Sequence, residues 1–312
     1  MEIKIGSLGG LVCDNFDAFK QLEKVKNLKS LYVTQWGLKI GDKSAVVDLR
    51  NTQIVGAVIR GINANIYLPN TCIEVIMHDG GIPIIAENSD HLTSLVVGSV
   101  SYVFDRNAEF FNSLQNATSL DKLILMRLHF MGFTSLSNFL TVSLPSVTQL
   151  SLNGSTPTSR QNVIKDLKGL NLFPNLKYLN VYYTDGKLDI SEIKNCPNLI
   201  QANFSYANVQ SLSGIESLDK LQKLIINDNN ISSLKPLESL KNLEYLELSN
   251  NAISDTSSYI ESDGSTRTYN NLEILANLNK NGKLKRLYLS GNDNIINWSP
   301  LSSLTWTEKS GW

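Results

Sequence analysis

Residues 221–231 read LQKLIINDNNI, and residues 243–253 read LEYLELSNNAI. The second stretch begins 22 residues after the first, and both follow the pattern L-x-x-L-x-L-x-x-N-x-I. Between them, SSLKPLESL at residues 232–240 keeps an apolar residue at every third position. A fixed period of this length indicates stacked structural repeats rather than a single globular core.

Each repeat is predicted to be a short strand followed by a return segment. One repeat cannot cover its own apolar side, so successive copies stack and share a core. We therefore expect the side chains of Leu221, Leu224, Ile226, Ile231 and Leu234 to point inward. Burial of each contributes about 1.5–3 kcal/mol before the entropy cost of ordering the chain.

The asparagine of the pattern recurs at Asn229, Asn251 and Asn292, where the chain leaves the strand. A side-chain amide at this point can donate to and accept from backbone groups that the turn leaves unpaired. We interpret these asparagines as structural residues rather than as a binding site.

The repeat phase extends through most of the chain, although the repeat length varies. Moving upstream from Ala202, the fourth position of the pattern falls at Leu179, Leu150, Leu123 and Leu95, in steps of 23, 29, 27 and 28 residues. The longer steps leave room for helices, expected at residues 105–115, 135–141, 160–168 and 190–194. Downstream, the step from Leu246 to Leu287 is 41 residues. We expect the added length to hold a solvated polar loop at 254–271 and a helix at 272–278.

The first third of the chain is less regular. Residues 28–36 (LKSLYVTQW) match one repeat, after a predicted amphipathic helix at 16–25. Short strand-like segments follow at 45–49, 54–59, 64–68, 72–77 and 82–86, separated by turn residues. We predict one continuous solenoid with an N-terminal cap and degenerate strand-rich repeats at 1–91, stacked repeats of varying length at 92–297 and a Trp-rich C-terminal cap at 298–312.

From about Leu92 to Leu304 the chain resembles the leucine-rich repeat family, and residues 221–253 are similar to internalin repeats. The resemblance implies an α/β solenoid with a curved parallel β-sheet on its concave face and helices and 3-10 turns on its convex face. It also implies that the concave face binds another macromolecule, usually a protein. Because one fold serves many functions, the site must be argued from its own residues.

The third, fifth and seventh positions of the pattern should face solvent from the strand. Across the repeats these positions are rich in Tyr, Asn and Ser, which contact a partner at low entropic cost. The candidate partner-binding residues, which include two neighbouring tyrosines, are Tyr178, Asn180, Tyr182, Tyr183, Asn203, Tyr206, Tyr245, Glu247 and Tyr288. The alternative is that a polar sheet in an Asn-rich protein has this composition without any binding role.

Charge and composition exclude several classes of partner. The chain carries 28 Lys and Arg against 29 Asp and Glu, which argues against general electrostatic binding to nucleic acid or to a membrane surface. We find no Sec-type signal and no apolar run long enough to cross a bilayer. Three widely spaced cysteines are typical of a reducing compartment. We therefore expect a cytoplasmic protein, or one associated with a virion or another assembly.

No motif for catalysis or metal binding is found. The three histidines lack the spacing of a zinc site, and residues 37–44 (GLKIGDKS) do not fit a phosphate-binding loop. We predict no enzyme activity, cofactor, metal or small-molecule substrate. The favoured hypothesis is a non-enzymatic protein-binding module. A structural subunit of a virion or surface structure, and an adhesin or effector exported without a Sec signal, remain the alternatives.

Overall fold

The structure is a computed structural model. It describes residues 2–6, 20–34, 45–60, 64–78, 83–85, 89–98, 107–126, 134–153, 164–184, 186–281, 283–302, 304 and 308–310. The chain divides into two compact units, unit 1 (Met1–Leu152) and unit 2 (Asn153–Trp312), which are described separately.

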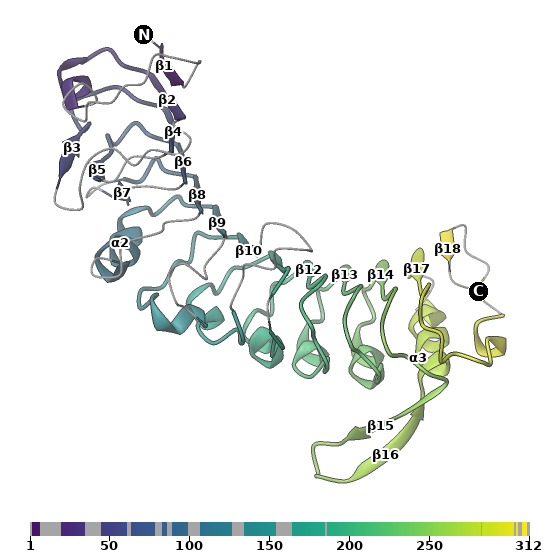
Figure 1. The fold of residues 1–312 in the computed structure, drawn as a ribbon. Coiled ribbons are helices and arrows are strands. Elements are labelled where there is room, and N and C mark those ends of the chain that lie inside the picture. Colours follow the sequence, from purple (N-terminus) through teal and green to yellow (C-terminus); the bar gives the residue numbers. More distant parts are fainter. Residues whose placement is uncertain are drawn as a thin grey trace. The chain divides into compact units, whose positions relative to one another are not determined.

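Unit 1 is built on a parallel sheet with one strand per repeat (Figure 1). The strands, in spatial order, are β1 (Glu2–Gly6), β2 (Ser30–Thr34), β4 (Gly56–Arg60), β6 (Glu74–His78), β8 (Ser94–Gly98), β9 (Lys122–Met126) and β10 (Gln149–Asn153). Their register places Leu31, Ala57, Val75, Leu95 and Leu123 side by side. All five side chains are buried, so they form one column of the core.

A second, smaller sheet belongs to the irregular beginning of the chain. It contains β3 (Val46–Asp48), β5 (Asn65–Tyr67) and β7 (Pro83–Ile84), all parallel. The five strand-like segments predicted between residues 45 and 86 are thus confirmed, but they alternate between two sheets. Gly56, Glu74 and Ser94 begin consecutive strands of the larger sheet, which makes these repeats only 18 and 20 residues long. In these short repeats the return segment forms a strand of the smaller sheet, β5 or β7, instead of a helix.

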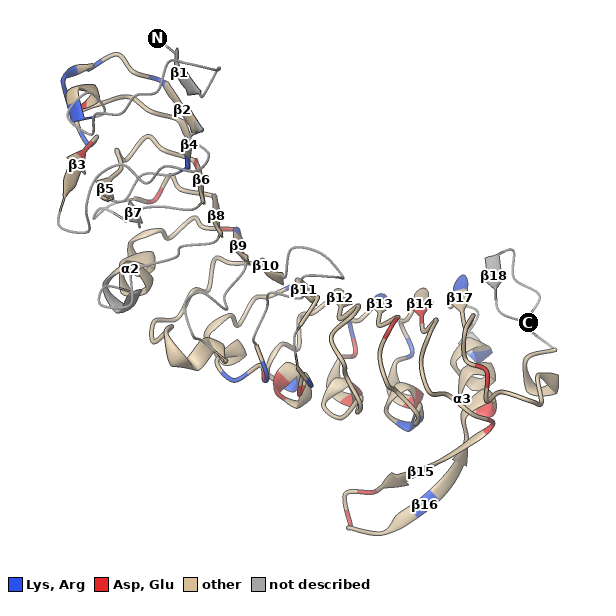
Figure 2. Cartoon of the chain, in the orientation of Figure 1, with Lys and Arg blue, Asp and Glu red and all other residues tan. Residues whose placement is uncertain are grey.

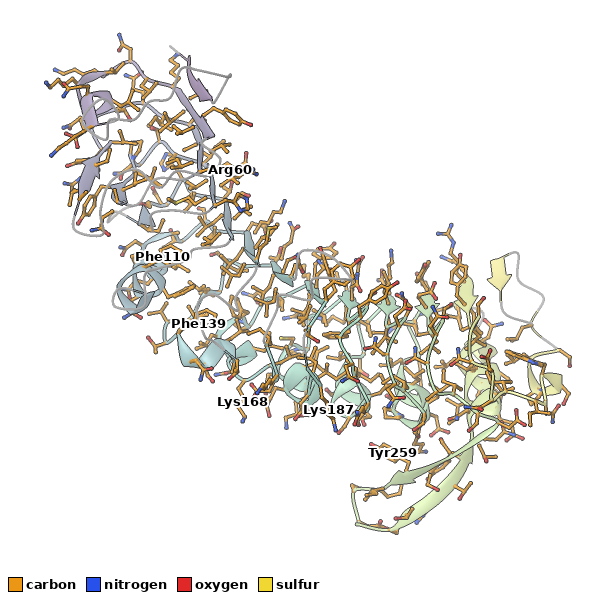
Figure 3. All side chains as sticks on the ribbon, viewed as in Figure 1. Arg60, Phe110, Phe139, Lys168, Lys187 and Tyr259 are labelled. Atoms are coloured by element: carbon orange, nitrogen blue, oxygen red, sulfur yellow. The ribbon has the colours of Figure 1, made fainter. Side chains whose placement is uncertain are left out.

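The later repeats of unit 1 return through helices. These are α2 (Asn107–Ser113), η2 (Leu114–Asn116) and η4 (Leu136–Asn138), which match the helices predicted at 105–115 and 135–141. The predicted helix at 16–25 is represented, among its described residues, by η1 (Gln21–Lys24). The ring of Phe111 lies 4.7 Å from that of Phe110 and 4.3 Å from that of Phe139, measured between centroids. Phe110 and Phe139 are labelled in Figure 3. This aromatic contact joins two successive helical returns.

Unit 2 continues the one-strand-per-repeat plan. Its strands, in spatial order, are β11 (Tyr178–Tyr182), β12 (Gln201–Asn203), β13 (Lys223–Ile225), β14 (Tyr245–Glu247), β17 (Arg286–Tyr288) and β18 (Glu308–Ser310). Leu179, Ala202, Leu224, Leu246 and Leu287 are paired in register, and each is 0% exposed. The repeat phase predicted from the sequence is therefore confirmed. We call the side of unit 2 that carries these strands the strand face.

The return segments of unit 2 lie on the opposite side, which we call the helical face (Figure 1). They are mostly 3-10 turns: η5 (Leu170–Leu172), η6 (Ser191–Asn195), η7 (Ile215–Ser217), η8 (Lys235–Ser239), α3 (Asn271–Leu278), η9 (Asn279–Asn281) and η10 (Ser299–Leu301). The predictions at 190–194 and 272–278 are confirmed. The prediction at 160–168 is wrong for its described residues, 164–168, because Asp166 forms a β-bridge with Asp189 there.

The polar stretch 254–271 is not a loop. It forms an antiparallel hairpin of β15 (Thr256–Ile260) and β16 (Thr266–Asn270), which projects from the helical face (Figure 1). Asn271, 0% exposed, holds the base of this hairpin. Its amide nitrogen donates to the carbonyls of Ser232 and Ser254, both at 2.9 Å. Its oxygen accepts from the Leu234 N–H at 3.0 Å and the Ser257 hydroxyl at 2.9 Å.

The consensus asparagines form the predicted structural ladder. The Asn229 amide nitrogen donates to the carbonyls of Phe204 and Ile226 at 2.8 and 3.0 Å, and its oxygen accepts from the Val209 N–H at 2.9 Å. Asn251 repeats this arrangement one repeat later, where its oxygen accepts from the Ile231 N–H. Each asparagine thus bonds its own turn to the preceding repeat.

Candidate functional site

The predicted site residues all lie in unit 2, at or just beyond its strands. Tyr178, Asn180 and Tyr182 belong to β11, and Asn203 belongs to β12. Tyr245 and Glu247 belong to β14, Tyr288 belongs to β17, and Tyr183 and Tyr206 follow β11 and β12. Tyr178 is exposed, and the other eight are partly exposed. None is buried in the core, which confirms the expected orientation toward solvent for the seven residues that hold the third, fifth or seventh position of the pattern.

The turn after each strand has an unusual backbone. The residue just before the consensus asparagine position has a positive φ in five successive repeats: Tyr183 (58°), Tyr206 (56°), Asp228 (56°), Asn250 (56°) and Gly291 (72°). Gly, Asn and Asp accept this left-handed conformation readily, whereas a bulky side chain there is an outlier. Two tyrosines therefore occupy positions at which the neighbouring repeats use the residues that suit the turn.

These two tyrosines belong to one aromatic cluster. The ring of Tyr183 lies 5.1 Å from that of Tyr182, edge to face, and 5.2 Å from that of Tyr206. Burial, more than the neighbouring Tyr183, raises the pKa of the Tyr182 hydroxyl. Burial, followed by a hydrogen bond to the Asp228 carboxylate, raises the pKa of the Tyr206 hydroxyl. We call Tyr182, Tyr183 and Tyr206 the tyrosine cluster. Because their pKa values are raised, the hydroxyls of Tyr182 and Tyr206 stay protonated at neutral pH and can donate hydrogen bonds.

A polar network adjoins the tyrosine cluster. The Ser205 hydroxyl lies 2.6 Å from the side-chain oxygen of Asn203 and 2.8 Å from that of Asn227. The Asn250 amide donates to the Asp228 carboxylate at 2.9 Å. These bonds hold the side chains beside the rings in place, so this part of the surface is preorganised.

Two other predicted residues, Tyr178 and Tyr245, are the first residues of their strands. The rings of Tyr245 and Tyr288 are 5.5 Å apart, and the Lys223 ammonium lies over the Tyr245 ring, 4.7 Å from its centroid. A shallow pocket of about 490 Å³ opens here, lined by Tyr178, Ile200, Gln201, Gln222, Lys223, Glu244, Tyr245, Lys285 and Arg286. The structure thus brings Tyr178 and Tyr245 to one pocket, separate from the tyrosine cluster.

The charged residues of this pocket were not among the predicted site residues. Lys223 and Arg286 hold the same strand position as Tyr245, and Lys285 forms an ion pair with Glu244 at 2.6 Å. Figure 2 shows basic residues on both β13 and β17. In the sequence, these residues are recognisable as charges at the second and third positions of the repeat pattern. The net charge of the whole chain is near zero and does not reveal them.

Two further features concern chemistry. Among the described residues, no group of three His, Cys, Asp or Glu side chains could hold a metal ion. Burial raises the pKa of the Cys72 and Cys196 thiols to about 12. Both cysteines are therefore protonated, unreactive parts of the core.

Comparison with known proteins identifies the repeats. Residues 219–261 match the family model described as Leucine Rich repeats (2 copies). These residues are leucine-rich repeats. They contain the two stretches that decided the fold in the sequence, and β13 and β14 are their strands. No curated protein matches the chain.

Solved leucine-rich repeat structures are similar to the chain. An internalin from Listeria monocytogenes is 17% identical, and the superposition has a TM-score of 0.50. The match covers 94% of this chain and 88% of the internalin chain. A leucine-rich repeat protein from Leptospira interrogans is 15% identical, covers 99% of this chain and 100% of its own, and has a TM-score of 0.41. The likeness to the internalin concerns the fold, a leucine-rich repeat solenoid, as the sequence predicted.

The leucine-rich repeat solenoid commonly mediates binding between proteins, through the extended surface that its stacked strands create. No helix among the described residues has the length and apolar character needed to span a membrane.

Proposed function

We propose that the chain is a non-enzymatic protein-binding module that recognises a partner protein through the strand face of unit 2. The tyrosine cluster is its central contact, and Tyr178, Asn180, Asn203, Tyr245, Glu247 and Tyr288 extend the contact surface along the strands. Tyrosine provides a large, rigid contact area and a hydroxyl donor at low entropic cost, which is why it is enriched where binding energy concentrates.

The observation that carries this proposal is the left-handed backbone of Tyr183 and Tyr206. A left-handed conformation costs an ordinary residue about 1–2 kcal/mol. Asp228, Asn250 and Gly291 form the same turn in neighbouring repeats, so the turn itself does not require an aromatic ring. Strained residues of this kind concentrate at functional sites. Partner binding supplies a reason for two aromatic rings at a turn that neighbouring repeats form without them.

The test replaces both strained tyrosines by the residue that suits the turn. The double variant Tyr183→Asn with Tyr206→Asn removes the rings and keeps an acceptable left-handed residue. Ile296→Asn is the matched control, since it removes an apolar side chain that is 85% exposed on another part of unit 2. Each protein is used to capture partners from native lysate, and the captured proteins are identified by mass spectrometry.

We expect a partner to be captured by the wild type and by the control but lost with the double variant, whose melting temperature is not lowered. Capture by all three proteins would contradict the proposed site. Recovery of the chain in fixed ratio with many copies of one assembly would instead favour a structural subunit.

A further inference from the structure

Basic residues gather along one edge of unit 2. They stand at the first residue of β11, β13, β14 or β17 or in the four residues before it: Lys177, Lys220, Lys223, Lys241, Lys283, Lys285 and Arg286. These four segments carry only two acidic residues, Asp219 and Glu244, whereas at the start of β18 Glu308 is paired in register with Arg286. All seven basic residues are exposed except Lys223, which is partly exposed. We call this row the basic edge; its local excess of positive charge contrasts with the formal charge of -1 for the whole chain.

The pocket lies at the middle of the basic edge. Lys223, Tyr245 and Arg286 are paired in register on three adjacent strands. Because neighbouring strands lie about 4.8 Å apart, Lys223 and Arg286 begin about 10 Å from each other, with Tyr245 between them. The Lys223 ammonium rests against the Tyr245 ring, and Lys285 is held by Glu244. These two contacts hold the lysine side chains in place in the pocket that Tyr245 also lines.

We infer that the basic edge binds an acidic, extended segment of the partner protein, with carboxylates at Lys223 and Arg286 and the intervening chain over Tyr245. This inference rests on the proposed function and adds the chemistry of the partner. A polyproline II chain repeats every three residues with a rise of about 3.1 Å per residue. Acidic residues three positions apart therefore face the same way about 9 Å apart, which matches the spacing of the two basic residues.

Exposed charge pairs are individually weak, so affinity has to come from several contacts acting together. Such binding must weaken as salt rises, because the Debye length is only about 8 Å at physiological ionic strength. Complementary charge between the basic edge and the acidic segment also increases the association rate constant more than it decreases the dissociation rate constant.

The test uses two fluorescent probes, the peptides (Glu-Pro-Pro)4 and (Lys-Pro-Pro)4, and measures binding by anisotropy at low and high salt. The variant Lys223→Gln with Arg286→Gln removes two charges from the basic edge. The control, Lys168→Gln with Lys187→Gln, removes two charges from exposed residues on the helical face (Figure 3). Circular dichroism verifies that both variants fold.

We expect the acidic peptide to bind the wild type and the control, to bind the basic-edge variant about tenfold or more weakly, and to be released by salt. The lysine peptide should not bind. Failure of the acidic peptide to bind, equal binding of both peptides or an equal loss in the control would overturn the inference. The capture experiment separates the two proposals, since a partner lost with the tyrosine variant but retained by the basic-edge variant would refute the acidic segment alone.

Discussion

Asn271 offers the sharpest test of how this repeat array tolerates its inserted hairpin. Replacement by leucine keeps a side chain of similar size and removes all four of its hydrogen bonds, which are 2.9–3.0 Å long. Three of the groups left behind are backbone atoms, those of Ser232, Leu234 and Ser254. A buried polar group without a partner costs about 1–3 kcal/mol. Allowing for the apolar area that leucine buries, we expect Asn271→Leu to lower the free energy of unfolding by about 3–6 kcal/mol.

The assay is urea denaturation followed by far-UV circular dichroism, with native-state hydrogen exchange to locate the effect. Amides of β15 and β16 should lose protection first, because Asn271 bonds to Ser254 and Ser257 at the base of the hairpin. Asn198→Leu is the control, since Asn198 is partly exposed and its side chain bonds at the surface, to the Pro174 carbonyl and the Lys220 ammonium. A loss for Asn271→Leu no larger than that of the control would refute the reasoning.

The isosteric Asn271→Asp separates hydrogen bonding from packing. Its carboxylate still accepts from Leu234 and Ser257 but faces two carbonyl oxygens with no proton to donate. Burial therefore raises the pKa of this new carboxyl group, and the folded state favours its neutral form. The stability of the variant is greatest below the unfolded pKa of about 3.9 and is lost as pH rises through the higher folded value. Stability independent of pH in this range would contradict that account.

Three further outcomes are expected. Leu224→Ala, at a site 0% exposed, should cost about 2–5 kcal/mol in urea denaturation. Cys72 and Cys196, with pKa values raised to about 12, should resist iodoacetamide at pH 8 in the folded protein and react in urea, as peptide mass spectrometry can show. Burial, then a hydrogen bond to Glu216, raises the Tyr259 pKa to about 12. The neutral Tyr259 hydroxyl should stabilise the fold fully below pH 10, and this stabilisation should be lost as the pH rises through about 12. The difference in tyrosinate absorbance between the wild type and Tyr259→Phe reports the ionisation of Tyr259.

Much of the fold was accessible from the sequence because the repeat phase is set by a few strongly constrained positions. Leu224 and Leu246 have to be apolar to share a core, and Asn229 and Asn251 have to carry an amide to bond the turn. The short strand-like segments of the first third were also recognisable. Their division between two sheets was not, because alternation along one strand does not reveal which other strand pairs with it. The domain boundaries at 91/92 and 297/298 stay predictions.

The hairpin was missed for a related reason. Residues 256–260 read TSSYI and 266–270 read TRTYN, and only their β-branched and aromatic residues favour strands. The polar composition fits a hairpin that projects from the helical face and touches it through Tyr259, whose hydroxyl donates to Glu216 at 2.9 Å. A buried asparagine such as Asn271 gives no signal at all, because its partners come from residues up to 39 positions away.

The candidate site was partly predictable. The tyrosines and asparagines of the strand face were identified by their repeat positions, and their role in binding stays a prediction. The left-handed backbone of Tyr183 and Tyr206 was not recognised, although aligning the repeats places them with Asp228, Asn250 and Gly291. That alignment carries the signal, since the last three residues are the usual occupants of a left-handed turn.

The inserted hairpin also makes this chain convenient to engineer. Strands β14 and β17 pair directly, in register, although the repeat that separates them is 41 residues long. Residues inserted on the helical face therefore leave the pairing of these two strands intact. At the hairpin tip, Gly264 has a φ of 81° and open space around it. A fluorescent reporter or an immobilisation handle grafted at this tip would leave the strand face free for binding measurements.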